Sequence, residues 1–203
     1  FKIDLYTNVK KTISLSATLQ SDNKFLNRMY EIMFPLLERP KDFGYDKYIV
    51  VDAYIYHLLD VNKVKYKQRG RASYSHVAFE ESIMRQEKIF KRYKEMIVDI
   101  IQTTFVPEWK PGQKMLIFCA TIDMCTRLTQ YLKNMFIEFD VTRYVGEDDY
   151  SVVERNNIIV STLKSAGTAV DIPGLKTTLM TVAVGSRQAN EQAVGRLRKL
   201  KQW

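Results

Sequence analysis

The stretch Met115-Leu-Ile-Phe-Cys119 decides the fold class, because this uninterrupted apolar run is followed by an amphipathic helical pattern over 123–136. Further segments of both kinds follow: apolar runs at 141–145, 158–161 and 179–184, and a helical pattern at 188–199. Short apolar strands that alternate with helices are typical of a mainly parallel sheet flanked by helices. The sequence therefore predicts an α/β fold, with ligands at the carboxyl ends of its strands. The loops after Phe118, Ser161 and Val184 are the ones expected to carry function.

The chain before this stretch has a different pattern. Residues 10–19 predict a short strand, and Ser21 or Asp22 is expected to cap a helix whose apolar positions extend to Met33. β-branched and aromatic residues over 48–59 predict a second strand, with a turn at 60–62.

One long amphipathic helix is predicted over 80–105. Its apolar stripe comprises Ile83, Phe90, Ile97 and Ile101, with Tyr93, Met96 and Ile100 beside it. Pro107, Pro111 and Gly112 follow the helical pattern, so we expect a boundary near residue 111.

Five cations alternate with other residues directly after the predicted turn: Lys63, Lys65, Lys67, Arg69 and Arg71. In an extended segment alternate side chains share one face, so these charges are expected to lie together. Folding alone gives no reason to gather like charges. One interpretation is a surface that contacts nucleic-acid phosphates, and the other is an edge strand that lysines protect from aggregation.

The charge balance of the 203 residues agrees with either interpretation, because 31 Lys and Arg against 23 Asp and Glu give a formal net charge of +8. Such a surplus favours polyanionic partners, or it only raises solubility. No apolar run is long enough to cross a bilayer, so a soluble protein is expected. Cys119 and Cys125 are the only cysteines, and with His57 and His76 they do not form a zinc-binding pattern.

The last helical pattern has a constellation of polar residues. Gln192, Arg196 and Lys199 are spaced i, i+4, i+7, so they share one helix face, whereas Arg198 lies on the opposite side. Gly195 lowers helix propensity, which indicates close approach by another group. Such a face can clamp phosphate oxygens, although a solvated basic helix end is the simpler interpretation of this segment alone.

Four segments resemble motifs of the superfamily 2 helicases, in the order in which that family carries them. The segments are Ser16-Ala17-Thr18 (motif III), 116–121 (motif IV), 161–175 (motif V) and 192–199 (motif VI). The closest resemblance is to phage and large-DNA-virus helicases that remodel DNA branches or displace transcripts. It covers nearly the whole chain, with 41–111 matched only loosely.

This resemblance implies the C-terminal half of an ATP-dependent DNA helicase or translocase. Residues 1–24 would be the tail of a first RecA-like domain, 25–111 a linker or insert with a β-hairpin and a long helix, and 112–203 the second RecA-like domain. ATP would bind between the two domains, and Mg²⁺ would be held by the first. The sequence contains no phosphate-loop motif, so we expect the chain alone to lack ATPase activity. A cytoplasmic location is expected, in a host cell or with a virion if the protein is viral, and no membrane partner.

The resemblance also implies roles for individual residues. In catalysis, Arg196 would be an arginine finger, Gln192 would orient it, and Arg198 or Lys199 would supply a second cation. The implied nucleotide-binding residues at the cleft between the domains are Gly167, Asp171 and Gly195, and Asp171 would contact either the ribose or the partner domain. The implied nucleic-acid contacts are Thr121, Ser161, Thr162 and Lys164, beside the alternating cations. Coupling between domains is implied for Ser16, Ala17 and Thr18.

Two positions depart from the family's pattern: Lys199 stands where the final arginine of motif VI is usual, and Ala169 replaces a glycine of motif V. Lysine lacks the planar fork of arginine, so it serves as a point charge, or Arg198 takes its place. The alternatives are an RNA helicase, a non-catalytic RecA-fold module that binds nucleic acid or protein, and the translocase subunit of a restriction enzyme.

Overall fold

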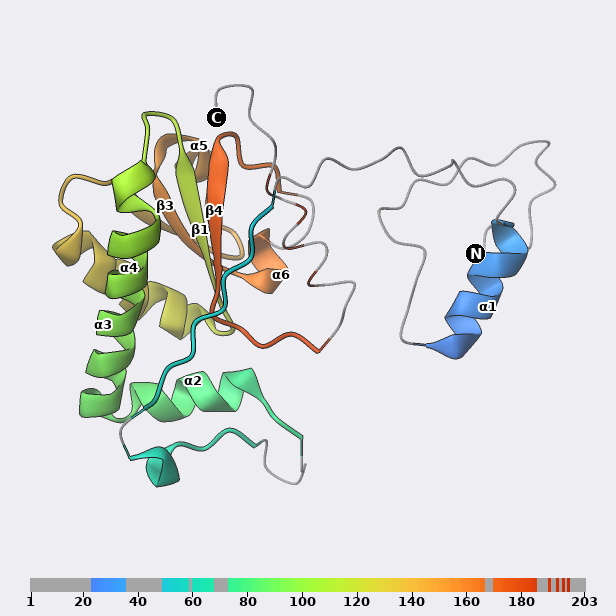
Figure 1. The fold of residues 1–203 in the computed structure, drawn as a ribbon, viewed down its shortest axis with the longest axis horizontal. Helices are drawn as coiled ribbons and strands as arrows, with labels where there is room; N and C mark the ends of the chain where they lie inside the picture. Colours follow the sequence, from blue (N-terminus) through green and yellow to red (C-terminus); the bar gives the residue numbers. More distant parts are fainter. Residues whose placement is uncertain are drawn as a thin grey trace.

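A four-stranded parallel sheet forms the centre of the computed structural model, which describes residues 23–35, 49–58, 60–67, 73–166 and 170–185 together with 190, 193, 195 and 197. The strands are β1 (Lys114–Cys119), β2 (Val141–Tyr144), β3 (Ile158–Thr162) and β4 (Leu175–Met180). Their order is β2-β3-β1-β4, and each pair is parallel (Figure 1). The predicted α/β fold is confirmed.

The last strand begins four residues before its predicted start at 179, and 181–184 are not part of it. Gly174 adopts φ +81°, and its carbonyl accepts a hydrogen bond from the Lys114 amide, so pairing with β1 starts directly after this turn. A Cβ at Gly174 would lie 2.1 Å from the Gly112 carbonyl oxygen, so the turn requires glycine. Pairing with β1 ends at Phe118, opposite Met180, one residue before β1 itself ends.

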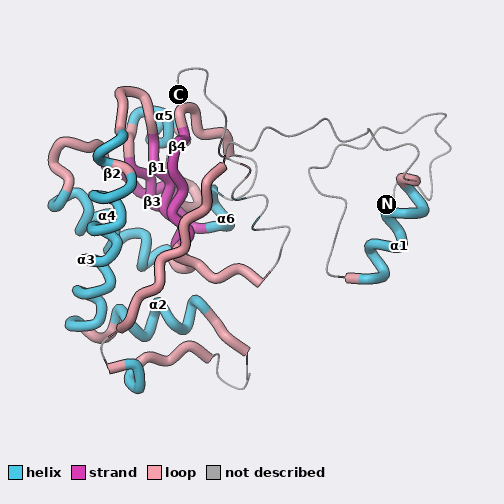
Figure 2. The backbone as a smooth tube through the Cα atoms, viewed as in Figure 1, coloured by secondary structure: helices cyan, strands magenta, loops and turns pink. Residues whose placement is uncertain are grey.

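Helices cover both faces of the sheet (Figures 1 and 2). Met115, Ile117 and Cys119 face one core with α2 (His76–Met84), α3 (Glu87–Thr104) and α4 (Ile122–Met135). Leu116 and Phe118 face the other core, which contains residues of α5 (Ser151–Arg155) and α6 (Leu163–Ala166). The strand's period of two thus distributes its side chains between two hydrophobic layers.

The prediction of a single helix over 80–105 is wrong, because α2 and α3 are separate helices. Gln86 has extended backbone angles, and its side-chain amide donates to the Lys63 carbonyl at 2.7 Å. The predicted apolar stripe is nevertheless buried throughout, with Ile83 and Ile97 fully inaccessible. Both helices share one core with the sheet, so packing is continuous across the boundary predicted near residue 111.

The strand predicted over 48–59 is also wrong within the described residues 49–58, which contain no strand. Val50, Val51 and Ile55 are largely exposed. These residues favour a strand, but the described residues provide no neighbouring strand with which the segment could pair. The turn at 60–62 is confirmed: Asp60 has φ +54° and precedes a short 3₁₀ helix, η2 (Val61–Lys63). In the region of the predicted β-hairpin, the described residues form one isolated antiparallel β-bridge, between Lys67 and Tyr74.

The N-cap of helix α1 (Lys24–Met33) is Asn23, one or two residues after the expected caps, and its side chain accepts hydrogen bonds from the Phe25 and Leu26 amides. Another 3₁₀ helix, η3 (Val106–Glu108), follows α3. The strand predicted at 10–19 lies outside the described residues. So does most of the last predicted helix, although residues 190 and 193 are helical. Among the described helices, none is long and apolar enough to span a membrane.

Replacing Ile97 with alanine tests whether α3 and the sheet form one cooperative unit. The side chain is fully buried in the shared core, so Ile97→Ala should lower the free energy of unfolding by about 2–5 kcal/mol. Urea unfolding followed by circular dichroism should show one transition that shifts as a whole. Ile137→Ala, at an 87% exposed position, should change stability by less than about 0.5 kcal/mol. A separate transition that alone responds to Ile97→Ala would mean that α3 folds apart from the sheet.

Candidate functional site at the carboxyl ends of the strands

A buried carboxylate occupies the loop that follows β1. Glu80, which is fully inaccessible on α2, accepts hydrogen bonds from the Ala120 amide at 2.7 Å and the Thr121 amide at 2.8 Å. The Thr121 hydroxyl also donates to it at 2.8 Å and accepts from the Met124 amide at 3.1 Å, as the N-cap of α4. Glu80 therefore takes the position at this helix N-terminus that an anion would otherwise occupy.

This geometry constrains the role predicted for Thr121. Its hydroxyl hydrogen and its amide both point to Glu80, so a nucleic-acid phosphate could bind there only by displacing that carboxylate. Burial raises the pKa of Glu80, and the three hydrogen bonds act in the opposite direction because they favour the charged form.

His76 lies one helical turn before Glu80, and its Nε2 is 3.7 Å from a Glu80 oxygen. The Nδ1 atom of His76 lies 3.4 Å from the Ala183 amide nitrogen. Because an amide N–H can only donate, Nδ1 is a hydrogen-bond acceptor, and it also accepts a hydrogen bond from the Tyr74 hydroxyl at 2.7 Å. The ring proton therefore lies on Nε2. Burial lowers the pKa of His76 to about 4, so the ring is neutral at pH 7.

Sequence reasoning missed this polar cluster of Tyr74, His76 and Glu80. A signal was present, because Glu80 directly follows Phe79 and stands three residues before Ile83, on the apolar side of the predicted helix. A carboxylate at such a position is rarely buried without hydrogen-bond donors.

The loop after β3 lies beside the loop after β1, because Thr162 pairs with Cys119 in the sheet register. Ser161 and Thr162 are buried. The Ser161 hydroxyl donates to the Tyr144 carbonyl at 2.5 Å, and the Thr162 hydroxyl bonds Ser165. Of the three residues in this loop that were predicted to contact nucleic acid, Lys164 is exposed, whereas Ser161 and Thr162 are buried.

The predicted nucleotide-binding residues are described only in part. Asp171 is exposed and its carbonyl accepts a hydrogen bond from the Tyr150 hydroxyl, and Gly195 is exposed. Ala193 is fully buried in the same core as Leu116 and Phe118, which anchors this part of the last segment to β1. The predicted residues outside the described part are Ser16, Ala17, Thr18, Arg69, Arg71, Gly167, Gln192, Arg196, Arg198 and Lys199.

The structure describes three of the five predicted cations, Lys63, Lys65 and Lys67. Lys63 belongs to η2 and pairs with Asp60 at 3.0 Å, so it does not continue the extended segment. After it, Val64 is buried whereas Lys65 and Lys67 are exposed. Tyr66 between the two lysines is 45% exposed as well, so one shared face of cations stays a prediction.

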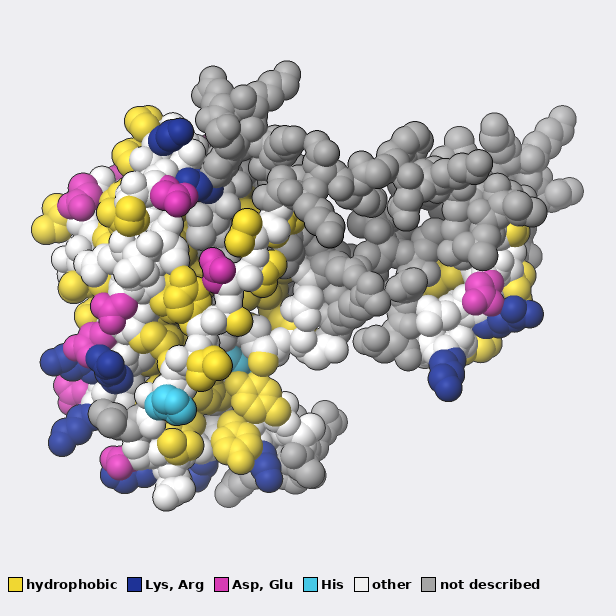
Figure 3. All heavy atoms as spheres, viewed as in Figure 1, with side chains coloured by type: hydrophobic (Ala, Val, Ile, Leu, Met, Phe, Trp, Pro, Cys, Tyr) yellow, Lys and Arg dark blue, Asp and Glu magenta, His cyan; other side chains and the backbone are white. Residues whose placement is uncertain are grey.

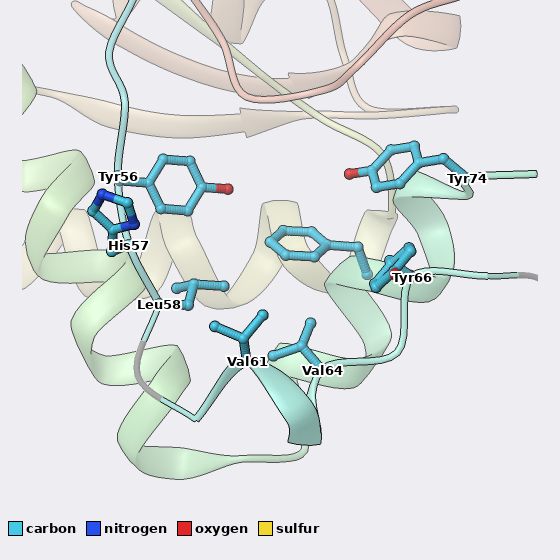
Figure 4. A pocket seen from close by; sticks show the side chains of 8 residues that line it. Tyr56, His57, Leu58, Val61, Val64, Tyr66 and Tyr74 are labelled. Atoms are coloured by element: carbon cyan, nitrogen blue, oxygen red, sulfur yellow. The ribbon is translucent and has the colours of Figure 1, made fainter.

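An aromatic cavity of about 370 Å³ lies beside these lysines. Its lining includes Tyr56, Tyr66, Tyr74 and Phe79, with His57 at one edge (Figure 4). In the space-filling view, apolar side chains gather in this part of the molecule beside histidine and basic side chains (Figure 3). The same Tyr74 lines the cavity and bonds His76, so the cavity is connected to the buried polar cluster.

Comparison of the chain with models of known protein families gives no match, and comparison with curated proteins finds none with significant similarity. Among the described residues, no group of three or more His, Cys, Asp or Glu could hold a metal ion.

His76 makes the stability of the protein depend on pH. The pKa of this ring is lower in the folded protein than the ordinary 6.5, so folding disfavours its protonation. Its stabilising contribution is present above pH 6.5 and is lost as the pH falls toward 4. Between pH 7 and pH 5 the free energy of unfolding should fall by about 1–2 kcal/mol through this residue, as urea titrations would measure. His76→Gln should remove that part of the dependence, and His57→Gln, at an exposed position, should not. Equal pH profiles for the protein and His76→Gln would contradict the assignment.

Proposed function

We propose that this chain is the C-terminal half of an ATP-dependent nucleic-acid helicase or translocase that acts on DNA. The observation that supports it is the convergence of three motif-bearing segments on β1. Residues 120–121 follow β1 directly, Thr162 pairs with its last residue, and Ala193 packs in the core that β1 forms with Phe118. Three of the four short motifs, in the order of the family, thus have described residues in or against one parallel sheet, and the fourth, Ser16-Ala17-Thr18, lies outside the described residues.

In this proposal the chain supplies one wall of the ATP site. Arg196 stabilises charge on the transferred phosphoryl group, Gln192 orients it, and Gly167, Asp171 and Gly195 contact the nucleotide. Mg²⁺ is held by an N-terminal RecA-like domain, as the resemblance to the helicases implies. Hydrolysis opens and closes the two domains, which moves the protein along a strand. On the strand, Lys65, Lys67 and Lys164 contact phosphates.

A non-catalytic RecA-fold module that binds protein and not nucleic acid is the second candidate. Glu80 favours it, because this carboxylate occupies the donors of Thr121 that the helicase reading assigns to a phosphate. The two candidates differ in whether the basic residues of 192–199 affect ATP turnover.

Replacing Arg196 in the complete helicase tests the catalytic part of the proposal. Without the arginine finger, Arg196→Ala should lower ATP turnover by roughly 10³-fold or more, because transition-state charge is no longer offset. ATP affinity should change far less. Separate Arg198→Ala and Lys199→Ala variants would identify the second cation, and Arg155→Ala, at an exposed position of α5, is the control. Near-normal turnover by Arg196→Ala would favour the non-catalytic module.

The strand-binding part can be tested on the chain itself. Each phosphate contact to a single strand adds about 0.7 to the slope of log affinity against log salt, so Lys65→Gln with Lys67→Gln should flatten it by about 1.4. Affinity should fall alike for all base sequences, because phosphate contacts do not read bases. Lys133→Gln, an exposed lysine on α4, should leave the slope unchanged. An unchanged slope with faster aggregation of the double variant would support edge protection instead.

A further inference from the structure

The aromatic residues that line the cavity, Tyr56, Tyr66, Tyr74 and Phe79, are connected by ring contacts that run through His76 and Tyr93 behind them. Successive centroids are separated by 6.2 Å from Tyr66 to Tyr74, 5.8 Å from Tyr74 to His76 and 5.2 Å from His76 to Phe79. Phe79 then contacts Tyr93, and Tyr93 contacts Tyr56, at 6.2 and 6.1 Å. Rings in mutual contact at such distances hold one another in place, so the cavity is built before any ligand enters.

The rings leave a recess with an apolar interior and polar groups at its mouth. Phe79 and Val64 are buried within it, whereas Tyr56, Tyr66 and Tyr74 are between 41% and 50% exposed. The hydroxyls of Tyr56 and Tyr74 face each other across the opening (Figure 4). Its volume of about 370 Å³ falls in the range of roughly 300–1,000 Å³ that is usual for small-ligand sites. A flat aromatic group with a polar edge suits this shape.

The charges around the cavity indicate the kind of molecule to which the flat aromatic group belongs. Of the described residues that line it, none is acidic, and nearby Asp60 is neutralised by Lys63. Lys65 and Lys67 flank Tyr66 in sequence, and the Lys67 ammonium lies 5.9 Å from the centre of the Tyr66 ring. An anion bound to Lys67 would therefore lie next to the opening. A flat aromatic group that is attached to a chain of anions is a base of a nucleic-acid strand.

We propose that this cavity binds an unpaired base of the strand whose phosphates contact Lys65 and Lys67. The base stacks on Tyr66, and its polar edge bonds the phenol oxygens of Tyr56 and Tyr74. Stacking on aromatic rings is tolerant of sequence, as a translocating protein requires. This inference rests on the nucleic-acid binding in the proposed function, and it adds a site for bases to a surface for phosphates.

The test measures binding of two fluorescent oligonucleotides to the chain by anisotropy: a short single strand, and the same sugar–phosphate chain without bases. Tyr66→Ala should weaken binding of the first by about 5- to 150-fold, the effect of losing one stacked contact. It should leave binding of the second unchanged. Tyr66→Trp should retain affinity for both strands. Tyr54→Ala, a 48% exposed tyrosine that does not line the cavity, is the matched control and should behave as the unmodified chain.

A second variant keeps every ring and closes the cavity. Val61 lines it and is largely exposed, so Val61→Trp fills the recess without removing a buried contact. This variant should lose affinity for the strand with bases and not for the strand without them. Thermal unfolding of both variants checks that the fold is retained.

Three results would overturn the inference. Unchanged affinity of Tyr66→Ala and Val61→Trp for the strand with bases would mean that another occupant, a protein segment or part of this chain, covers the cavity. Equal weakening on both strands would mean that Tyr66 supports the phosphate surface and not a base. If the unmodified chain binds neither strand, the proposed function itself fails.

Discussion

Both layers of the fold depend on the burial of β1. This strand pairs with β3 on one side and β4 on the other, and all six of its residues are buried. Because alternate side chains of β1 enter opposite cores, the helices on both faces of the sheet pack against this one strand. Residues 120–121 follow this strand, Thr162 pairs with it and Ala193 packs in its core, so its position sets theirs.

Glu80 joins the helical layer to the edge of the sheet at which the carboxyl ends of the strands lie. A buried carboxylate needs hydrogen-bond donors, and the loop after β1 supplies three of them from Ala120 and Thr121. Removing the donors would leave a fully inaccessible carboxylate without hydrogen-bond partners. The orientation of α2 and the conformation of the loop are therefore fixed together.

The same helix connects this edge to the aromatic cavity. His76 contacts Glu80 on one side and receives the Tyr74 hydroxyl on the other, and Tyr74 forms part of the cavity wall. A strand that bound at Lys65, Lys67 and the cavity would thus rest on a surface supported by the polar cluster behind it. In this proposal the lysines and the aromatic cavity both lie in front of the polar cluster of Tyr74, His76 and Glu80.

The sequence determined the parallel α/β architecture, since apolar runs such as 115–119 are long enough for buried strands and alternate with amphipathic helices. It also determined the buried stripe from Ile83 to Ile101, because helical periodicity is local. Only the tertiary structure decided that 49–58 is not a strand and that the helix breaks at Gln86. Both depend on partners distant in sequence: a neighbouring strand that is absent for 49–58 among the described residues, and the Lys63 carbonyl that holds Gln86. The cluster of His76 and Glu80 and the aromatic cavity were decided in the same way, because contacts between α2 and residues 120, 121 and 183 have no periodic signature along the chain.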